Sequence, residues 1–379
     1  MNSFAAPPAR PLSRAEDLVS SFTTAGYAFV QPPVLQPAEP FLDLSGEDIR
    51  KSLFLTSDAT GDELCLRPDL TIPVARAYLA SSAAGEPQGF CYFGPVFRQR
   101  AGKPSEFIQA GIESFGRKDH AAADAEMLAL AIEAASAFGR REIDIRTGDV
   151  GLFAALISAL DLAPVWKRRL MKDFNRKVNL AQDLQRMTLA TSAARTDYQG
   201  VLAALAGSDR KAALALVSDL ISIAGATNLS GRTNAEIADR FLEQSTMAGG
   251  PLPRETITAI ERYLAISGEP DDAVAQLRAL ARDAKLDITR EIDLLETRIG
   301  FMAARGLDVS AIRFATAFGR GVDYYTGFEF ELHAIGNGAE PLVAGGRYDG
   351  LLTRLGSATP IPAVGFSIWI DALAPEGLA

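Results

Sequence analysis

The charged and amide side chains of residues 90–116 (FCYFGPVFRQRAGKPSEFIQAGIESFG) are the first candidates for chemistry in this chain. Gln109 and Glu113 stand at positions i and i+4 of an apolar run, so they lie on one face if that run is a strand. Arg98 and Arg100 precede them. A carboxylate, an amide and two guanidinium groups can hold a small charged ligand. We therefore expect this face to line a pocket; the alternative is a sheet with one solvated polar face.

A hairpin must position these side chains. The alternating and aromatic residues from 90 onward predict one strand, and residues 106–115 predict the return strand. Between them, residues 101–105 are rich in Gly, Lys, Pro and Ser, which favours a long tip.

Composition bounds the class of protein. The chain has 379 residues, of which 48% are hydrophobic, and this suggests two or three domains with a sizeable core. The net charge of −9 argues against a protein that mainly binds nucleic acid, because phosphates require clustered Lys and Arg.

Cys65 and Cys91 fit no metal spacing and are expected as buried free thiols. No signal peptide or membrane-spanning run is evident, so we expect a cytoplasmic protein.

The N-terminal third predicts a helix, an extended segment and a second hairpin. Residues 13–25 indicate an amphipathic helix with Ser13 as its N-cap. Residues 27–46 contain several prolines, which favour an extended chain over a helix. Residues 53–71 indicate a hairpin that turns at 60–62 and runs into a helix.

The middle of the chain is almost wholly helical by its apolar spacing. We expect residues 150–305 to form an inserted helical domain, with the sheet resuming at 312–318. Within it, residues 166–177 (WKRRLMKDFNRK) concentrate positive charge. A solvated helix face is the favoured interpretation, and docking on an acidic partner or a phosphate is the alternative.

Several of these segments carry a family resemblance. FGPVFRQR and FIQAGIESFG resemble motif 2 of class II aminoacyl-tRNA synthetases, most closely the histidyl-tRNA synthetase family. RPDLT, GRGVDYY and GGRYDGL are similar to further signatures of the histidyl type, and residues 27–46 resemble motif 1, through which these proteins dimerise. The resemblance covers nearly the whole chain outside the helical insertion.

The resemblance implies an α+β fold, a class II synthetase-like antiparallel sheet flanked by helices. The core domain is expected at residues 1–149 and 306–379, with the helical insertion at 150–305. It also implies a histidine pocket: Gln109 and Glu113 would lie beside the α-ammonium group, and Arg98 would face the carboxylate. The complete implied set is Asp69, Thr71, Arg98, Gln109, Glu113, Arg320, Tyr324, Tyr325 and Tyr348. Asp69 departs from the glutamate typical of the family.

The ATP half of the site departs from the synthetase pattern. Ala372 stands where motif 3 carries an arginine, and a methyl group cannot replace a permanently charged fork. Trp369 stands where a glycine leaves room for ATP, and Arg100 replaces a glutamate that reads adenine. The sequence after Leu373 is too short for the anticodon-binding domain that synthetases carry there, so we expect none.

These departures resemble those of the regulatory subunits of ATP phosphoribosyltransferase, a family of synthetase paralogues without ligase activity. The resemblance implies a partner, the short-form catalytic subunit, in a hetero-octamer that performs the first step of histidine biosynthesis. It implies activation of that subunit, feedback inhibition by L-histidine, and no tRNA or membrane partner. We expect no catalytic residue, metal or cofactor, since His120 and His333 are isolated in the sequence. A truncated histidyl-tRNA synthetase and another synthetase-paralogue ligase are the alternatives.

Overall fold

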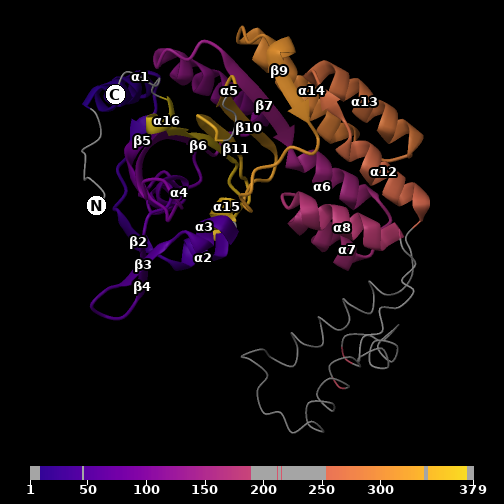
Figure 1. Ribbon diagram of the computed structural model, residues 1–379, viewed down its shortest axis with the longest axis horizontal. Coiled ribbons are helices and arrows are strands. Elements are labelled where there is room, and N and C mark those ends of the chain that lie inside the picture. The colour runs from indigo at the N-terminus through magenta and orange to yellow at the C-terminus, as the bar shows by residue number, and fades with distance from the viewer. Residues whose placement is uncertain are drawn as a thin grey trace. The chain divides into compact units, whose positions relative to one another are not determined.

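The computed structural model describes residues 9–44, 47–188, 211, 215, 253–336 and 340–373. The chain divides into two compact units, unit 1 with Met1–Ala155 and Tyr263–Ala379, and unit 2 with Leu156–Arg262. Unit 1 contains both sheets of the described chain (Figure 1).

A nine-stranded mixed sheet organises unit 1. Its strands are mostly antiparallel, but β1 is parallel to β5 and β7 is parallel to β9. In spatial order they are β1 (Ala28–Phe29), β5 (Gln88–Phe97), β6 (Glu106–Phe115), β12 (Ala363–Trp369), β11 (Val343–Arg347), β10 (Phe328–Ala334), β7 (Ile143–Asp149), β9 (Ile312–Ala315) and β8 (Ser267–Gly268). The predicted hairpin of residues 90–116 is confirmed as β5 and β6, paired along their full lengths.

The pleat of this sheet separates an apolar face from a polar one. Ala110 and Ile112 of β6 and Phe330 of β10 belong to one hydrophobic core. Because successive side chains alternate, the residues between them, such as Glu113 and Glu329, point to the other face. The predicted polar face is therefore real, and it is buried rather than solvated, because Gln109 and Glu113 are each only 1% exposed.

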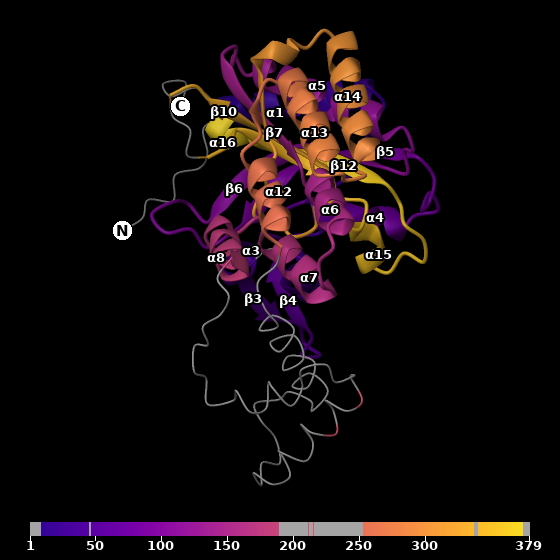
Figure 2. The same cartoon turned by 90° about the vertical axis from the view of Figure 1, so that its right-hand side faces the viewer.

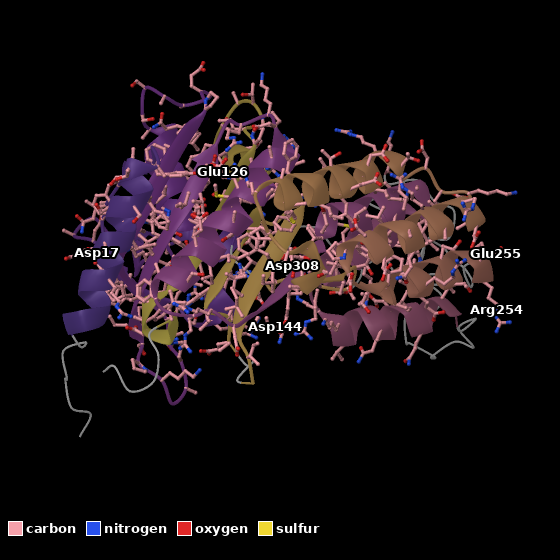
Figure 3. The ribbon with its side chains drawn as sticks, turned by 90° about the horizontal axis from the view of Figure 1, so that it is seen from above. Asp17, Glu126, Asp144, Arg254, Glu255 and Asp308 are labelled. Atoms are coloured by element: carbon pink, nitrogen blue, oxygen red, sulfur yellow. The ribbon has the colours of Figure 1, made fainter. Side chains whose placement is uncertain are left out.

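Helices cover the apolar face. α1 (Ala9–Thr24) packs on β5, α5 (His120–Ala137) packs on β11 and β12, and α14 (Thr289–Ala304) lies beside α5. α13 (Pro270–Asp283) packs in turn on α14 (Figure 2), and the short α16 (Ile370–Leu373) follows β12. Glu126 of α5, labelled in Figure 3, joins this layer because it accepts hydrogen bonds from Tyr27, Arg117 and Arg305.

A buried ion network lies under these helices. The guanidinium of Arg298 on α14 pairs with Asp124 of α5 at 2.8 Å and with Asp149, at the end of β7, at 2.9 Å. Arg347 of β11 pairs with Asp124 at 2.6 Å and with Asp349 at 2.9 Å. Arg298 is 1% exposed, so the network is shielded from water. A charge at this depth is tolerated only because its partners are fixed around it.

Smaller elements cover the polar face. They are α2 (Glu39–Leu44), α3 (Glu47–Lys51), α4 (Thr71–Leu79), α15 (Leu351–Arg354) and a three-stranded antiparallel sheet of β2 (Leu35–Pro37), β4 (Glu63–Leu66) and β3 (Phe54–Ser57). The second hydrophobic core lies among them and includes Tyr78 and Tyr92. The predicted turn between β3 and β4 is confirmed, and so are the buried free thiols of Cys65 and Cys91.

Two predicted boundaries are wrong, and proline explains both. α1 begins at Ala9, four residues before the predicted cap Ser13, and it contains Pro11 in its first turn. The segment 27–46 is not extended throughout, because Glu39–Leu44 is the helix α2 with Pro40 in its first turn. A proline is tolerated there, since the first N–H groups of a helix have no intrahelical acceptor.

The predicted helical insertion is described in part. α6 (Val150–Ala159), α7 (Pro164–Asp173), α8 (Lys177–Thr188) and α12 (Arg254–Leu264) are helices as expected, whereas nearly all of residues 189–252 lies outside the described residues. α13 and α14 are also helical, but they pack within unit 1 rather than within the insertion. The compact unit 2 is accordingly shorter than the predicted 150–305.

The basic run at 166–177 is partly neutralised inside unit 2. Arg169 of α7 pairs with Asp183 of α8 at 2.6 Å, and Arg176 approaches Asp173 at 3.7 Å. Lys167 donates to the backbone carbonyl of Ser158. These bonds tie α7 to its neighbours and favour a structural role for much of the run. Docking on an acidic partner or a phosphate stays the untested alternative.

Candidate functional site

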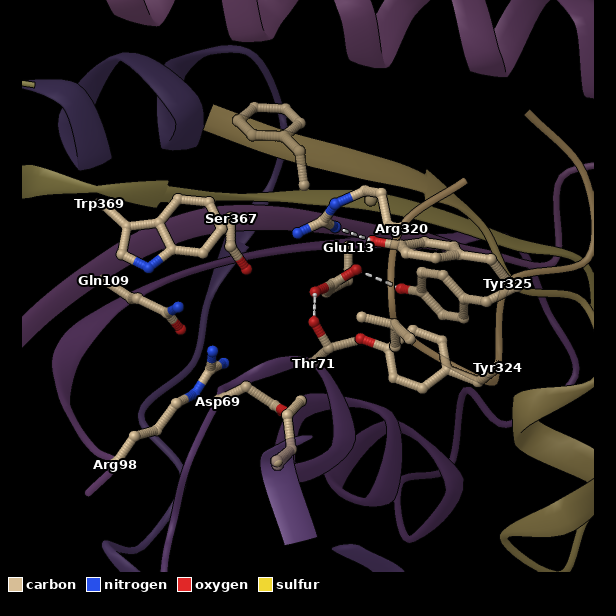
Figure 4. Close-up of a pocket in the computed structure, with 15 residues that line it drawn as sticks. Asp69, Thr71, Arg98, Gln109, Glu113, Arg320, Tyr324, Tyr325, Ser367 and Trp369 are labelled. Carbon is tan, nitrogen blue, oxygen red and sulfur yellow. Dashed lines mark hydrogen bonds between the residues drawn. The ribbon is translucent and has the colours of Figure 1, made fainter. Parts of the chain in front are cut away.

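One cavity on the polar face gathers every residue of the predicted pocket (Figure 4). Its volume is about 50 Å³. One water molecule needs about 10–15 Å³ on this measure, so the cavity suits a single small molecule in close contact with its walls. The predicted residues among its walls are Asp69, Thr71, Arg98, Gln109, Glu113, Arg320, Tyr324, Tyr325 and Tyr348.

Separate elements bring these side chains together. Gln109 and Glu113 alternate along β6, and the neighbouring β12 adds Gly365, Ser367 and Trp369 at the same period. The remaining residues lie where elements begin or end: before and at the start of α4, after β5, after β11, and in the segment between β9 and β10. The strands form the floor of the cavity, and residues at the ends of helices and strands form its other walls.

The carboxylate of Glu113 is buried and accepts hydrogen bonds from three hydroxyl groups. Its Oε1 accepts hydrogen bonds from Thr71 Oγ1 at 2.7 Å and from the Tyr92 hydroxyl at 3.3 Å, and its Oε2 accepts one from the Tyr348 hydroxyl. Burial raises the pKa of Glu113 to about 8, although these hydroxyl donors oppose the rise. This carboxyl group can therefore change its charge when a ligand brings a donor or a positive charge to it.

Gly365 makes room for that carboxylate. It faces Glu113 across the β6–β12 ladder, and a Cβ atom at position 365 would overlap Glu113 Oε2. The backbone carbonyl of Ile112 also lies against this point. A glycine is thus required here for close approach, not for its conformational freedom.

The opposite end of the cavity combines one cation with two unsatisfied acceptors. Arg98 donates through Nε to the carbonyl of Pro68 at 2.7 Å, and no described residue accepts from its terminal nitrogens. Asp69 Oδ2 and Gln109 Oε1 are buried and have no hydrogen-bond partner among the described residues. Burial raises the pKa of Asp69, and the charge of Arg98 opposes that rise. Buried polar atoms without partners are costly, so this end is prepared for a ligand that supplies donors.

Tyrosine rings form the side wall. Tyr324 and Tyr348 meet edge to face with ring centroids 5.7 Å apart, and Tyr325 lies 5.1 Å from Tyr324. The hydroxyl of Tyr325 accepts from Arg320 Nη1 at 2.7 Å, whereas no described residue hydrogen-bonds the hydroxyl of Tyr324. Such a wall can stack on a flat ring and offer it one hydroxyl group.

A column of acidic side chains on β10 holds Arg320 in place. Glu331 accepts from Arg320 Nε at 3.1 Å and contacts His333 Nε2 at 2.9 Å. Glu329 Oε2 accepts from the Arg320 backbone N–H at 2.8 Å, but its buried Oε1 has no partner in the described chain. Burial raises the pKa of Glu329 to about 8.

Replacing Glu329 by glutamine is expected to stabilise the protein at alkaline pH but not at acidic pH. The folded-state pKa of about 8 lies above the ordinary 4.5, so folding favours the protonated form, and this contribution is lost as pH rises through 8. Glutamine imitates the protonated carboxyl and removes the loss. The difference in thermal midpoint between Glu329→Gln and the native chain should increase by a few degrees from pH 5 to pH 8.5. An equal difference at both pH values would contradict this account of Glu329.

A second, larger cavity adjoins the first where the synthetase pattern is broken. It has a volume of about 450 Å³ and is lined in part by Arg100, Phe107 and Ala372. The Arg100 guanidinium stacks 4.0 Å from the ring centroid of Phe107 and donates to the carbonyl of Pro104. Arg98, Arg320 and Trp369 line both cavities.

Four further residues shape the site and were not predicted from the sequence. Tyr92 and Gly365 shape the surroundings of Glu113, Ser367 bonds the Tyr92 hydroxyl at 2.8 Å, and Glu329 anchors Arg320. The alternation of β12 and β10 would have indicated Ser367 and Glu329 once the polar face was recognised. Nothing in the sequence indicates the role of Tyr92.

Two further findings concern other kinds of site. Within the described ranges, no cluster of three or more His, Cys, Asp or Glu side chains is arranged to hold a metal ion. Among the same residues, no helix combines the length and apolar character needed to cross a membrane.

Comparison with known proteins places this chain in one family. The sequence profile described as Histidyl-tRNA synthetase matches residues 9–228 and 212–373. The ATP phosphoribosyltransferase regulatory subunit of Brucella canis is 39% identical over 348 residues, 91% of this chain and 92% of that protein. The same subunit of Brucella melitensis biotype 1 is also 39% identical, with 91% of each chain covered.

Solved structures agree in fold. A Bacillus halodurans protein described as an ATP phosphoribosyltransferase regulatory subunit/histidyl-tRNA synthetase has a TM-score of 0.69 at 23% identity, covering 99% of this chain and 81% of that one. The histidyl-tRNA synthetase of Nostoc has a TM-score of 0.62 at 19% identity, covering 98% and 75%. At such identities these likenesses concern the fold alone. The predicted class II synthetase-like fold is confirmed, and the chain belongs to the family of ATP phosphoribosyltransferase regulatory subunits.

Proposed function

We propose that this chain binds L-histidine and, as a non-catalytic subunit, activates the short-form catalytic subunit of ATP phosphoribosyltransferase and carries its feedback inhibition. The proposal that the ligand is histidine rests on the cavity in which the predicted residues meet. Its two ends have different chemistry, and each end matches one part of histidine.

The end at Arg98 matches the backbone of a free amino acid. The unsatisfied oxygens of Asp69 and Gln109 can accept N–H groups from an α-ammonium, and the free nitrogens of Arg98 can donate to an α-carboxylate. A zwitterion is therefore recognised through both charges. Figure 4 shows these three side chains facing one another at one end of the cavity.

The end at Glu113 matches an imidazole. A neutral imidazole has one N–H donor and one acceptor nitrogen. Glu113 can accept the first, and the hydroxyl of Tyr324 can donate to the second, while the tyrosine rings stack on the plane. This arrangement moves Glu113 from the α-ammonium, where the resemblance suggests it, to the ligand's side chain.

The assembly is also a proposal. The relatives' name supports a catalytic partner, and a hetero-octamer in the cytoplasm without tRNA is the arrangement the family resemblance implies. A homodimer through residues 27–46 is supported by exposed apolar side chains on neighbouring edges, which are Phe29, Val34 and Leu35. Apolar groups of this size are favourable to bury at an interface.

Co-purification with a short-form catalytic subunit tests this function. The complex should be more active than the catalytic subunit alone, and L-histidine should inhibit it at concentrations that leave the isolated catalytic subunit active. Calorimetry on this chain alone should detect one L-histidine site. A chain that forms no complex, or a complex indifferent to L-histidine, would refute the proposal.

The purified chain is expected to catalyse no histidine-dependent exchange of pyrophosphate into ATP. Ala372 offers no charge to a phosphate, Trp369 fills part of the wall beside the amino acid, and Arg100 is engaged with Phe107 and Pro104. Without an arginine at position 372 to bind the phosphates, adenylate formation loses part of its electrostatic stabilisation. The measurement is radiolabel exchange with a histidyl-tRNA synthetase as positive control. Detectable exchange would favour the ligase alternatives.

A further inference from the structure

The two cavities described above share one wall. The small cavity of about 50 Å³ and the larger one of about 450 Å³ are both lined by Arg98, Arg320 and Trp369. The two arginines are held by polar bonds to Pro68, Tyr325 and Glu331. The indole of Trp369 is the bulky apolar part of this wall.

The position of Trp369 is fixed by the sheet. It is the last residue of β12, in register with Gln109 of β6, and its backbone N–H donates to the carbonyl of Leu342 at 3.0 Å. The side chain is partly buried and packs against the core of the polar face. α16 begins at the next residue, so both sides of Trp369 are in regular structure. The backbone of Trp369 is therefore fixed, and its indole is held by packing against the core of the polar face.

The proposed ligand presents its carboxylate to this wall. Arg98, the group that would bind the carboxylate, belongs to both cavities, whereas Glu113 and the tyrosines line only the small one. Any group attached to the carboxyl carbon must therefore pass from the small cavity toward the larger one. Figure 4 shows the indole beside Gln109 on this side of the pocket.

We infer that Trp369 makes the pocket selective for a free α-carboxylate, so that it rejects histidine extended at its carboxyl group, as in peptides or esters. The inference rests on the proposed function and deepens it. Such a pocket binds free histidine and does not bind histidine that is already part of a larger molecule. Its occupancy therefore follows the concentration of the free amino acid. The larger cavity also balances Arg98, Arg100 and Arg320 against acidic side chains at 331, 340 and 371, so it offers no net charge to attract an anionic extension.

Two derivatives in which an uncharged amide replaces the α-carboxylate separate the effect of size from that of charge. L-Histidinamide has an amide of nearly the same shape as the carboxylate, and L-histidylglycinamide carries one further residue on that amide. Calorimetry with the full chain should show histidinamide binding more weakly than L-histidine, through loss of the charge at Arg98. Histidylglycinamide should bind at least about tenfold more weakly still, as expected when a close-packed pocket must reject added atoms.

Variants of Trp369 complete the test. In Trp369→Ala the two amides should bind within about threefold of each other, because the opening leads into the larger cavity, and Trp369→Phe should keep most of the native discrimination. Glu340→Gln, which lines only the larger cavity, is the matched control and should behave as native. Equal binding of both amides to the native chain would overturn the inference and leave the proposed function standing. Failure of L-histidine itself to bind would overturn both.

Discussion

Replacing Arg298 by alanine is expected to lower the free energy of unfolding of unit 1 by about 3–5 kcal/mol, the usual cost of removing one partner from a buried ion pair. The variant leaves Asp149 without its guanidinium partner and Asp124 with only Arg347. Burial already raises the pKa of Asp149, and Arg298 opposes this rise. Without that cation, the carboxyl must either stay charged in an apolar layer or take up a proton.

The two tryptophans allow this loss to be measured in one unit. Trp369 lies in unit 1 and Trp166 in unit 2, so a Trp166→Phe background leaves the fluorescence of unit 1 alone. Urea denaturation followed by this signal should show a lower midpoint for Arg298→Ala. The matched control is Arg278→Ala on α13, where an exposed arginine bonds Asp293 and Glu296. The expected change there is much smaller, since water screens exposed pairs. Equal shifts in both variants would show that the buried network contributes no more stability than the exposed pairs of Arg278.

Alanine at Arg98 is expected to raise the concentration of L-histidine needed to inhibit the assembled complex without abolishing activation. Loss of hydrogen bonds to a charged group should weaken binding by about 1.5–3 kcal/mol, which is roughly 10- to 160-fold. Alanine at Gln109 should act in the same direction through the α-ammonium. Activation should persist, because it depends on the assembled interface and not on an occupied pocket.

The same variants test coupling between the two subunits. If L-histidine inhibits chemistry on the partner, it must favour one arrangement of the complex, and linkage then requires the partner's state to change histidine affinity equally. Calorimetry on the free chain and on the complex should differ by a coupling free energy of about 1–3 kcal/mol. Arg278→Ala, remote from the cavity walls, controls for unspecific effects. Pocket variants that assemble and remain fully sensitive to L-histidine would place the inhibitory site outside this cavity.

The sequence by itself predicted most of the elements and many of the residues that line the small cavity. The alternation of Gln109 and Glu113 is a local property of a strand, so the polar face could be predicted before its neighbours were known. The family signatures identified all the predicted pocket residues that the structure brings together. The expected helix starts failed at Pro11 and Pro40, because a proline is compatible with both an extended chain and a first helical turn.

Only the tertiary structure decided the pKa values of the ionisable groups in the pocket and which residues form its boundary. Glu113 bonds Tyr348 across 235 residues of sequence, and Arg347 reaches Asp124 across 223, so no local pattern relates these partners. The raised pKa of Glu113 and the wall of Arg98, Arg320 and Trp369 that the two cavities share follow from contacts between elements distant in sequence. Likewise α13 and α14 show the same helical periodicity as the insertion and yet pack in unit 1. Periodicity reports which face of a helix is apolar, whereas the surface that covers that face is chosen by contacts distant in sequence.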